Sequence, residues 1–194
     1  EYEDMSFILH LLDHKDTFID IGSNLGSYSL ISGGVCRSLT YAIEPSQETY
    51  ERLLTNIKIN NLVNVHCLNI GAGEEEGRFL FTNSKGPENH LVDNENKFDD
   101  DLIKIDVKRL DNLNFAAHPT FMKIDTEGLE LSVLRGAINI LKSREMIGVL
   151  VEINGNNKRY NKTNSEIRDL LEGLNYFPYS FDPLTRDLNK IKKL

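Results

Sequence analysis

Two carboxylates and two glycines stand where the chain passes from apolar, β-branched segments into polar turns. Asp20 and Gly22 come at the end of residues 17–21, Gly26 follows four residues later, and Glu44 follows the next apolar segment. In proteins that alternate strands with helices, such positions meet at one edge of a parallel sheet, where ligands bind. A carboxylate about twenty residues past the first glycine is placed to accept hydrogen bonds from both hydroxyls of a ribose. These residues predict a ribose-containing cofactor.

The first loop distinguishes two such cofactors, NAD and S-adenosylmethionine. A dinucleotide requires three glycines and bare backbone N–H groups around its pyrophosphate. Here the loop is Gly22-Ser-Asn-Leu-Gly26, and Asp20 stands at its entrance. That carboxylate repels a pyrophosphate but attracts the amino group and the sulfonium of S-adenosylmethionine. The loop therefore favours S-adenosylmethionine. An NAD-dependent oxidoreductase and a non-catalytic binding module on the same fold are the alternatives.

Further polar residues follow the later apolar segments. They are Asn69 to Gly71, Asp125, and Glu152 to Asn154, and Glu127 comes in the turn after Asp125. Oxygen ligands of this kind suit a hard cation, but polar contacts to a substrate, without metal, are the favoured interpretation. Glu127 is either a catalytic group or a favourable charge at a helix N-terminus. His90, in a long polar segment, is a further candidate base.

Strands and helices alternate along the sequence, which predicts an α/β protein with a mainly parallel sheet. Ser46 is placed to cap the helix after the second strand, and Thr163 with Glu166 has capping-box spacing before the last helix. Residues 102–110 alternate as a half-exposed strand, and residues 83–101 form either a lid or a disordered segment. Five strands and a closing hairpin are expected at residues 17–21, 39–43, 63–68, 120–125, 146–153, and 176–181 with 188–191.

The composition fits one domain, residues 1–194, with a core of its own. A net charge of −8 without a basic stripe argues against nucleic acid as a partner. Cys36 and Cys67 have no metal-ligand spacing, which favours reduced thiols and a cytoplasmic protein. No apolar run reaches membrane-spanning length. Because the chain starts at Glu1, a missing or removed N-terminal segment stays open.

Three motifs resemble those of the FkbM-like S-adenosylmethionine-dependent methyltransferases. The first is Asp20-Ile-Gly-Ser-Asn-Leu-Gly-Ser-Tyr28, and the second is Glu44-Pro45. The third and most specific is Lys123-Ile-Asp-Thr-Glu-Gly-Leu-Glu-Leu-Ser-Val-Leu-Arg-Gly-Ala137. The resemblance covers nearly the whole chain. One departure is the helix after the first motif, which is expected to stop early at Gly33 and Gly34.

The resemblance implies a Rossmann-like class I methyltransferase fold with a mainly parallel, seven-stranded sheet whose last strand is antiparallel. It also implies O-methylation of a hydroxyl on a sugar, other glycan or natural-product acceptor. The acceptor's identity and the oligomeric state stay open. The expected catalytic residues are Asp125, Glu127 and His90. The expected cofactor-binding residues are Asp20, Ile21, Gly22, Ser23, Asn24, Gly26, Ser27, Glu44, Pro45, Asn69, Ile70, Gly71 and Asp125.

Overall fold

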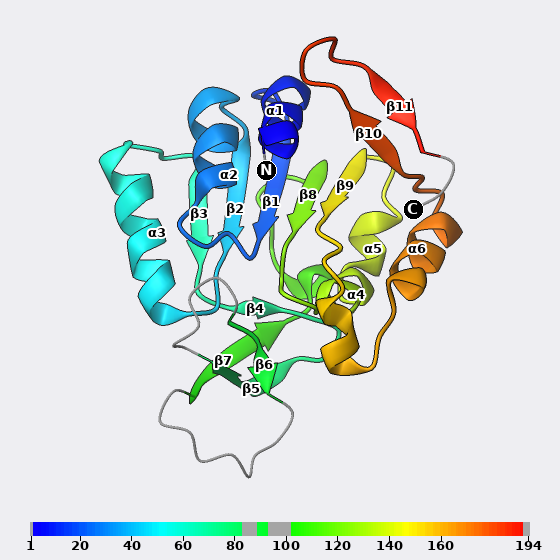
Figure 1. Ribbon diagram of the computed structural model, residues 1–194. Coiled ribbons are helices and arrows are strands. Elements are labelled where there is room, and N and C mark those ends of the chain that lie inside the picture. The colour runs from blue at the N-terminus through cyan, green and yellow to red at the C-terminus, as the bar shows by residue number, and fades with distance from the viewer. Residues whose placement is uncertain (1, 83–88, 93–101, 192–194) are drawn as a thin grey trace.

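A five-stranded parallel sheet forms the centre of the computed structural model, which describes residues 2–82, 89–92 and 102–191 (Figure 1). Its strands, in spatial order, are β3 (Val65–Leu68), β2 (Leu39–Ile43), β1 (Thr17–Ile21), β8 (Phe121–Ile124) and β9 (Gly148–Val151). All four pairings are parallel, so the carboxyl ends of the strands share one edge. This confirms the α/β class and the five strand locations, although β3, β8 and β9 are each shorter than expected.

Helices cover both faces of the sheet because side chains alternate along each strand. Phe18 packs with α1 (Tyr2–Leu11) and α2 (Ser27–Leu30), and the neighbouring α3 (Gln47–Ile59) covers Ala42 on the same face. Ile19 and the other side chains of the opposite face pack against α4 (Glu130–Arg135), α5 (Ile138–Leu141) and α6 (Asn164–Gly173). The central strand β1 is therefore buried along its whole length.

Local signals set several helix ends. Ser46 caps α3, and Thr163 with Glu166 forms the capping box of α6, both as predicted. The early stop at Gly33–Gly34 is wrong: α2 continues directly as a π-helix, η1 (Ile31–Val35). Those glycines are tolerated because η1 packs closely on its neighbours, where an added Cβ at Gly33 would lie 2.3 Å from a Val65 methyl group.

A second, four-stranded sheet lies across the carboxyl ends of the parallel strands (Figure 1). Its spatial order is β4 (Gly71–Ala72), β7 (Leu102–Lys108), β5 (Gly77–Thr82) and β6 (Leu91–Val92). The predicted alternation in β7 is confirmed, because Ile105 and Val107 are buried while Lys104 and Asp106 are exposed. Residues 89–92 belong to this sheet region. The lid-or-disorder prediction for residues 83–88 and 93–101 lies outside the described residues.

The closing hairpin forms where predicted but does not extend the central sheet. Strands β10 (Tyr179–Phe181) and β11 (Leu188–Lys190) make a separate two-stranded antiparallel sheet. The expected seven-stranded sheet with an antiparallel last strand is therefore wrong for the described residues. The hairpin is mostly exposed, and its Phe181 ring packs against Phe7 of α1 at a centroid distance of 5.3 Å. Within the described residues, the hairpin is thus attached to α1 by aromatic packing and does not pair with a strand of the central sheet.

Candidate functional site

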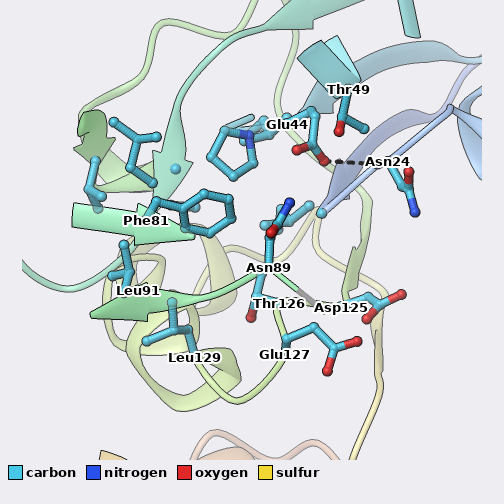
Figure 2. Close-up of a pocket in the computed structure, with 18 of the residues that line it drawn as sticks. Asn24, Glu44, Thr49, Phe81, Asn89, Leu91, Asp125, Thr126, Glu127 and Leu129 are labelled. Carbon is cyan, nitrogen blue, oxygen red and sulfur yellow. Dashed lines mark hydrogen bonds between the residues drawn. The ribbon is translucent and has the colours of Figure 1, made fainter. Parts of the chain in front are cut away.

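A pocket of about 300 Å³ lies between the carboxyl edge of the parallel sheet and the second sheet (Figure 2). In this view Asn24, Glu44 and Thr49 lie on one side, Asp125 and Glu127 lie on the other, and Phe81 and Leu91 form a third wall. The lining residues are Ile21, Gly22, Asn24, Ile43, Glu44, Pro45, Thr49, Gly71, Ala72, Phe81, Asn89, Leu91, Ile105, Val107, Asp125, Thr126, Glu127, Leu129 and Glu152.

The loop after β1 requires glycine at its first position. Gly22 has φ +73°, and a Cβ built on it would lie 1.7 Å from the backbone oxygen of Asp125. The backbone segments that follow β1 and β8 can approach this closely only because Gly22 has no side chain. Asn24 also has positive φ, at 49°, a conformation that Asn tolerates better than most residues. The loop thereby turns its Asn24 N–H toward the end of β2.

Glu44 receives that N–H and is almost completely buried at 7% exposure. Its Oε2 accepts from Asn24 N at 3.1 Å (Figure 2), and its Oε1 accepts from Ser46 N at 3.0 Å. Burial raises the pKa of Glu44 to about 7, although the two backbone hydrogen bonds oppose the shift. Asn69 fixes the backbone beneath it by donating to the Glu44 and Pro45 oxygens at 2.9 and 3.1 Å. Glu44 is therefore held rigidly, with the second lone pair of each oxygen still free to bind a ligand hydroxyl.

Two buried oxygens beside the loop have no hydrogen-bond partner in the described structure. They are Oδ1 of Asp20 and Oγ of Ser23. The other Asp20 oxygen accepts from Ser29 Oγ of α2 at 2.6 Å. Burial raises the pKa of Asp20, and Lys123 opposes that shift. Because buried polar atoms are normally bonded, these two oxygens suit a polar ligand group or a bridging water.

Lys123 links Asp20 to the other side of the pocket. It is buried, its Nζ lies 2.9 Å from Asp125 Oδ2, and it sits 4.6 Å from the centroid of the Tyr28 ring. Lys123 is the register partner of Asp20 in the neighbouring strand, so the two side chains share a face of the sheet. A buried cation thus stands between the carboxyl groups of Asp20 and Asp125.

A buried carboxylate shapes the turn that follows β8. Oε1 of Glu130 accepts from Thr126 N at 3.1 Å, from Thr126 Oγ1 at 3.2 Å and from Gly128 N at 2.9 Å. With its amide oriented to satisfy its neighbours, Asn157 donates to Gly128 O at 2.9 Å and to Glu130 Oε2 at 3.2 Å. Asn157 belongs to the 3₁₀ helix η4 (Asn156–Tyr160), which follows β9. Glu130 therefore docks η4 onto the turn.

Glu127 occupies the middle of this turn with φ +55°. Its Oε2 accepts from Asn156 Nδ2 at 2.6 Å and from Asn154 Nδ2 at 3.3 Å. Partial burial raises its pKa, and nearby Asp125 adds to the shift. A positive φ in a non-glycine residue costs about 1 kcal/mol or more, and the Glu130 network holds the strained turn in place.

Glu152 completes the acidic side of the pocket. It follows β9, and its N–H donates to Ile124 O at 3.0 Å, so it lies directly beside Asp125. A hydrogen bond with Asp125 and partial burial raise the pKa of Glu152 to about 7. In the described part of the chain, no cluster of three or more His, Cys, Asp or Glu side chains has metal-binding geometry.

The apolar wall of the pocket comes from the second sheet, and the sequence prediction missed it. Phe81, Leu91, Ile105 and Val107 line the pocket from β5, β6 and β7. The alternation in residues 102–110 predicted that one face of this strand is buried, but it did not predict that this face lines the pocket. Thr49, Thr126 and Leu129 were missed as well.

The structure brings most predicted site residues to this pocket. Ile21, Gly22, Asn24, Glu44, Pro45, Gly71, Asp125 and Glu127 line it. Among the described residues, the lining excludes Asp20, Ser23, Gly26, Ser27, Asn69, Ile70 and His90. Asp20 and Ser23 lie beside the first loop, and Asn69 hydrogen-bonds to the backbone of Glu44 and Pro45. Asn89 and Leu91 face the pocket, while His90 lies between them and pairs through its backbone with Thr82.

This fold is that of the class I methyltransferases. The FkbM methyltransferase structure from Methylobacillus flagellatus KT superposes with a TM-score of 0.61 at 21% identity, over 92% of this chain and 44% of its own length. A Streptococcus mutans protein solved in complex with SAH superposes with a TM-score of 0.56 at 12% identity, over 97% of this chain and 90% of its own. None of the helices described here is long and apolar enough to cross a membrane.

The chain belongs to the FkbM methyltransferase domain family, whose profile matches residues 20–178. This confirms the resemblance found in the sequence motifs. The hexuronic acid methyltransferase AglP of Haloferax volcanii is 30% identical over 155 residues, which make up 79% of this chain. The chain spans 62% of the length of that relative and 44% of the Methylobacillus structure.

Proposed function

We propose that this chain is an S-adenosylmethionine-dependent methyltransferase that methylates an oxygen atom of a sugar acceptor. The observation that carries the proposal is Glu44, a buried carboxylate held by two backbone N–H groups at the end of β2 and open to the pocket. Family membership gives the methyltransferase class. The cofactor and the acceptor follow from the residues around Glu44 and around Asp125.

The adenosine half of the cofactor fits the β1–β2 side of the pocket. The two oxygens of Glu44 match the two ribose hydroxyls, and charge-assisted bonds of this type are short and strong. The adenine ring fits the apolar wall, where Gly71 leaves room beside Ile105 and Val107. Flat aromatic ligands prefer pockets lined in this way, with a few polar groups fixing their orientation.

The methionine half fits the two orphaned oxygens. Oδ1 of Asp20 suits the cofactor's amino group, directly or through a water molecule, and Oγ of Ser23 suits its carboxylate. Both atoms lie beside Gly22, whose lack of a side chain keeps the loop close to Asp125. The acidic residues on the far side favour the positive sulfonium. These residues would hold the cofactor with its methyl group toward Asp125.

S-adenosylmethionine supplies a methyl group on a cationic sulfur, which an acceptor oxygen can displace in line. The protein then needs to orient the acceptor, exclude water and take up one proton. Asp125, Glu127 and Glu152 line the pocket where the acceptor would enter, and the amides of Asn154 and Asn156 hold Glu127 in place. Carboxylates and amides are suitable partners for a hydroxyl-rich acceptor.

A sugar acceptor is supported by the relative AglP, named as a hexuronic acid methyltransferase. NAD-dependent oxidation is disfavoured because Asp20 and Glu44 bring two buried carboxylates to the loop that would face a pyrophosphate. A non-catalytic module would have no need for the three carboxyl groups on the opposite side of the pocket.

Two measurements test the proposal. Isothermal titration calorimetry should detect S-adenosylhomocysteine binding, with NAD binding at least a hundredfold weaker. Transfer of a labelled methyl group from S-adenosylmethionine to methyl glucuronide or methyl glucoside should then occur. Failure to bind S-adenosylhomocysteine at millimolar concentration, or equal affinity for NAD, overturns the proposal. Binding without transfer to these or other oxygen acceptors favours the binding module.

A further inference from the structure

Three carboxyl groups line the acceptor side of the pocket, and two of them are already engaged. Asp125 is paired with the buried Lys123 at 2.9 Å. Glu127 accepts hydrogen bonds from Asn154 and Asn156. The Asp125 oxygen that faces Lys123 and the Glu127 oxygen that faces the two amides are therefore occupied by contacts within the protein. Either group would have to give up such a contact to take the proton of an acceptor at that oxygen.

Glu152 has the opposite surroundings. It continues the pairing of β9 with β8 one position past Val151, which places it against Asp125. In the described residues its side chain bonds to that carboxyl group and to no cation. Two adjacent carboxyl groups bind one proton between them, because both cannot ionise without repulsion. Because Lys123 pairs with Asp125 and not with Glu152, Glu152 is the member of this pair that is left to take up a proton.

The other charged groups around Glu152 act in the same sense or act weakly. Glu127, in the turn after β8, raises the pKa of Glu152. Lys123 in β8 lowers that pKa, but its effect is smaller than those of Asp125, burial and Glu127. Burial and the Asp125 bond supply the rest, for a pKa of about 7. Arg159 of η4 reaches the Glu127 backbone oxygen at 3.5 Å. Asp20 lies in β1 and Glu44 follows β2, which are two and three strands away from β9 in the sheet.

We propose that Glu152 is the base that takes the proton of the acceptor hydroxyl, with Asp125 and Lys123 as its positioning residues. This inference rests on the proposed function. The acceptor oxygen forms a bond to the methyl carbon while the carbon–sulfur bond breaks and its electron pair stays on sulfur. The hydroxyl proton passes to the Glu152 carboxylate and leaves to solvent after product release. The protein returns to its starting protonation state, so no further reactant is needed.

The same arrangement selects the kind of oxygen that is methylated. A sugar hydroxyl must lose a proton, and a base at the pocket serves that purpose. A sugar carboxylate has no proton to lose at neutral pH, and the charges of Asp125 and Glu127 would repel it. On methyl glucuronide, which offers both kinds of oxygen, the product is therefore a methyl ether that resists mild alkali. A methyl ester, which alkali cleaves, would contradict the inference.

Steady-state kinetics with Glu152→Gln and Asp125→Asn test the assignment. For the wild-type protein saturated with S-adenosylmethionine, we expect kcat/KM for the acceptor to rise with pH through an apparent pKa near 7. Glu152→Gln should lower kcat by about 10²–10⁴-fold, the usual cost of losing a positioned base, and should leave the affinity for S-adenosylhomocysteine unchanged. Asp125→Asn should shift the acidic limb to lower pH, because it removes the group that raises the pKa of Glu152 most. Glu172→Gln, an exposed change on α6, is the matched control.

Carbon-13 NMR of the carboxyl groups in the S-adenosylhomocysteine complex tests the proton site without an acceptor. We expect a resonance, separate from that of Glu44, that titrates near pH 7, disappears in Glu152→Gln and moves to lower pH in Asp125→Asn. The Glu44 resonance should disappear only in Glu44→Ala. The inference is overturned if Glu152→Gln removes no such resonance, or if that variant keeps its turnover and its acidic limb. The proposed function fails separately, by loss of S-adenosylhomocysteine binding in the wild-type protein.

Discussion

The two sides of the pocket are built in different ways. On the side of β1 and β2, the positions of the functional groups are set by the backbone: the positive φ of Gly22, and the N–H groups of Asn24 and Ser46 on Glu44. On the side of β8 and β9, side chains hold side chains, as in the Lys123–Asp125 pair and the amides on Glu127.

This difference matches the two ligands of the proposed function, a cofactor and an acceptor. A cofactor has one fixed shape, and a backbone-built site serves it without depending on many side chains. An acceptor site built from side-chain networks can change by substitution without moving the sheet. We infer that changes at the first side alter folding and cofactor binding, whereas changes at the second alter turnover or stability and leave cofactor binding intact. Four predictions test that division, from the largest expected effect to the smallest.

Gly22→Ala should have the largest effect, on folding itself. The added Cβ would lie 1.7 Å from Asp125 O, and the φ of +73° is strained for alanine. Strain and overpacking together should lower the free energy of unfolding by about 3 kcal/mol or more, measured by urea denaturation. Gly155→Ala is the matched control, because Gly155 has φ +82° and no atom within 4 Å of an added Cβ. Equal losses in the two variants would mean that the contact with β8 is unimportant.

Glu44→Ala should act mainly on cofactor binding. Removing charge-assisted bonds to two ribose hydroxyls costs about 1.5–3 kcal/mol for each bond before compensation. The dissociation constant of S-adenosylhomocysteine should rise by at least a hundredfold in calorimetry while the protein stays folded by circular dichroism. Glu127→Ala, on the opposite side, should change that constant less than threefold. A reversed result would remove the division between the two sides.

Glu130→Gln should weaken the second side without loss of cofactor binding. The substitution keeps the shape but removes the charge that accepts three hydrogen bonds from Thr126 and Gly128. We expect a loss of about 1–3 kcal/mol in the free energy of unfolding and a fall in kcat. The S-adenosylhomocysteine affinity should stay within about threefold, and a proportionate loss of affinity would contradict the division.

The pH dependence of cofactor binding should show the smallest effect. The pKa of Glu44 is about 7, so its ionised form is about tenfold less populated at pH 6 than at pH 8. The association constant of S-adenosylhomocysteine should fall about tenfold over that range. The contribution of Glu44 to the stability of the ligand-free protein has the opposite sign. Because its pKa is raised from 4.5, that contribution is present below 4.5 and is lost as the pH rises to about 7.

In Glu152→Gln, the pH dependence of S-adenosylhomocysteine binding should persist, because Glu44 causes it. In Glu44→Ala it should disappear. A binding curve that is flat between pH 6 and pH 8 in the wild-type protein would show that the protonation of Glu44 does not control the first side of the pocket.

The sequence predicted best what depends on local pattern. Residues 17–21 and 39–43 were predicted at their observed bounds, because β-branched strands, turn glycines and the Ser46 cap are all local signals. The direction of Glu44 into a pocket followed from the rule for strand ends in parallel sheets. Family membership was recognisable for the same reason, since its motifs are short and contiguous.

Contacts between distant segments were not predictable. Nothing near Phe81 or Leu91 in the sequence indicates that their sheet crosses the ends of the parallel strands. The separate hairpin β10–β11 also depends on a distant contact, the packing of Phe181 on Phe7. The contact between the carboxyl groups of Asp125 and Glu152 depends on two residues twenty-seven positions apart that become neighbours only when β8 and β9 pair.

The second sheet, which covers the pocket, is built from one continuous stretch of the sequence. Strands β4 to β7 all lie between Gly71 and Lys108, and they hydrogen-bond to one another in a sheet of their own. The parallel strands that carry Glu44 and Asp125 come before and after that stretch. Residues 71–108 can therefore be exchanged as one continuous segment, which would change the shape of the pocket in one step. The parallel sheet, with Gly22, Glu44 and Asp125 at its carboxyl edge, would be the same in every such chimaera.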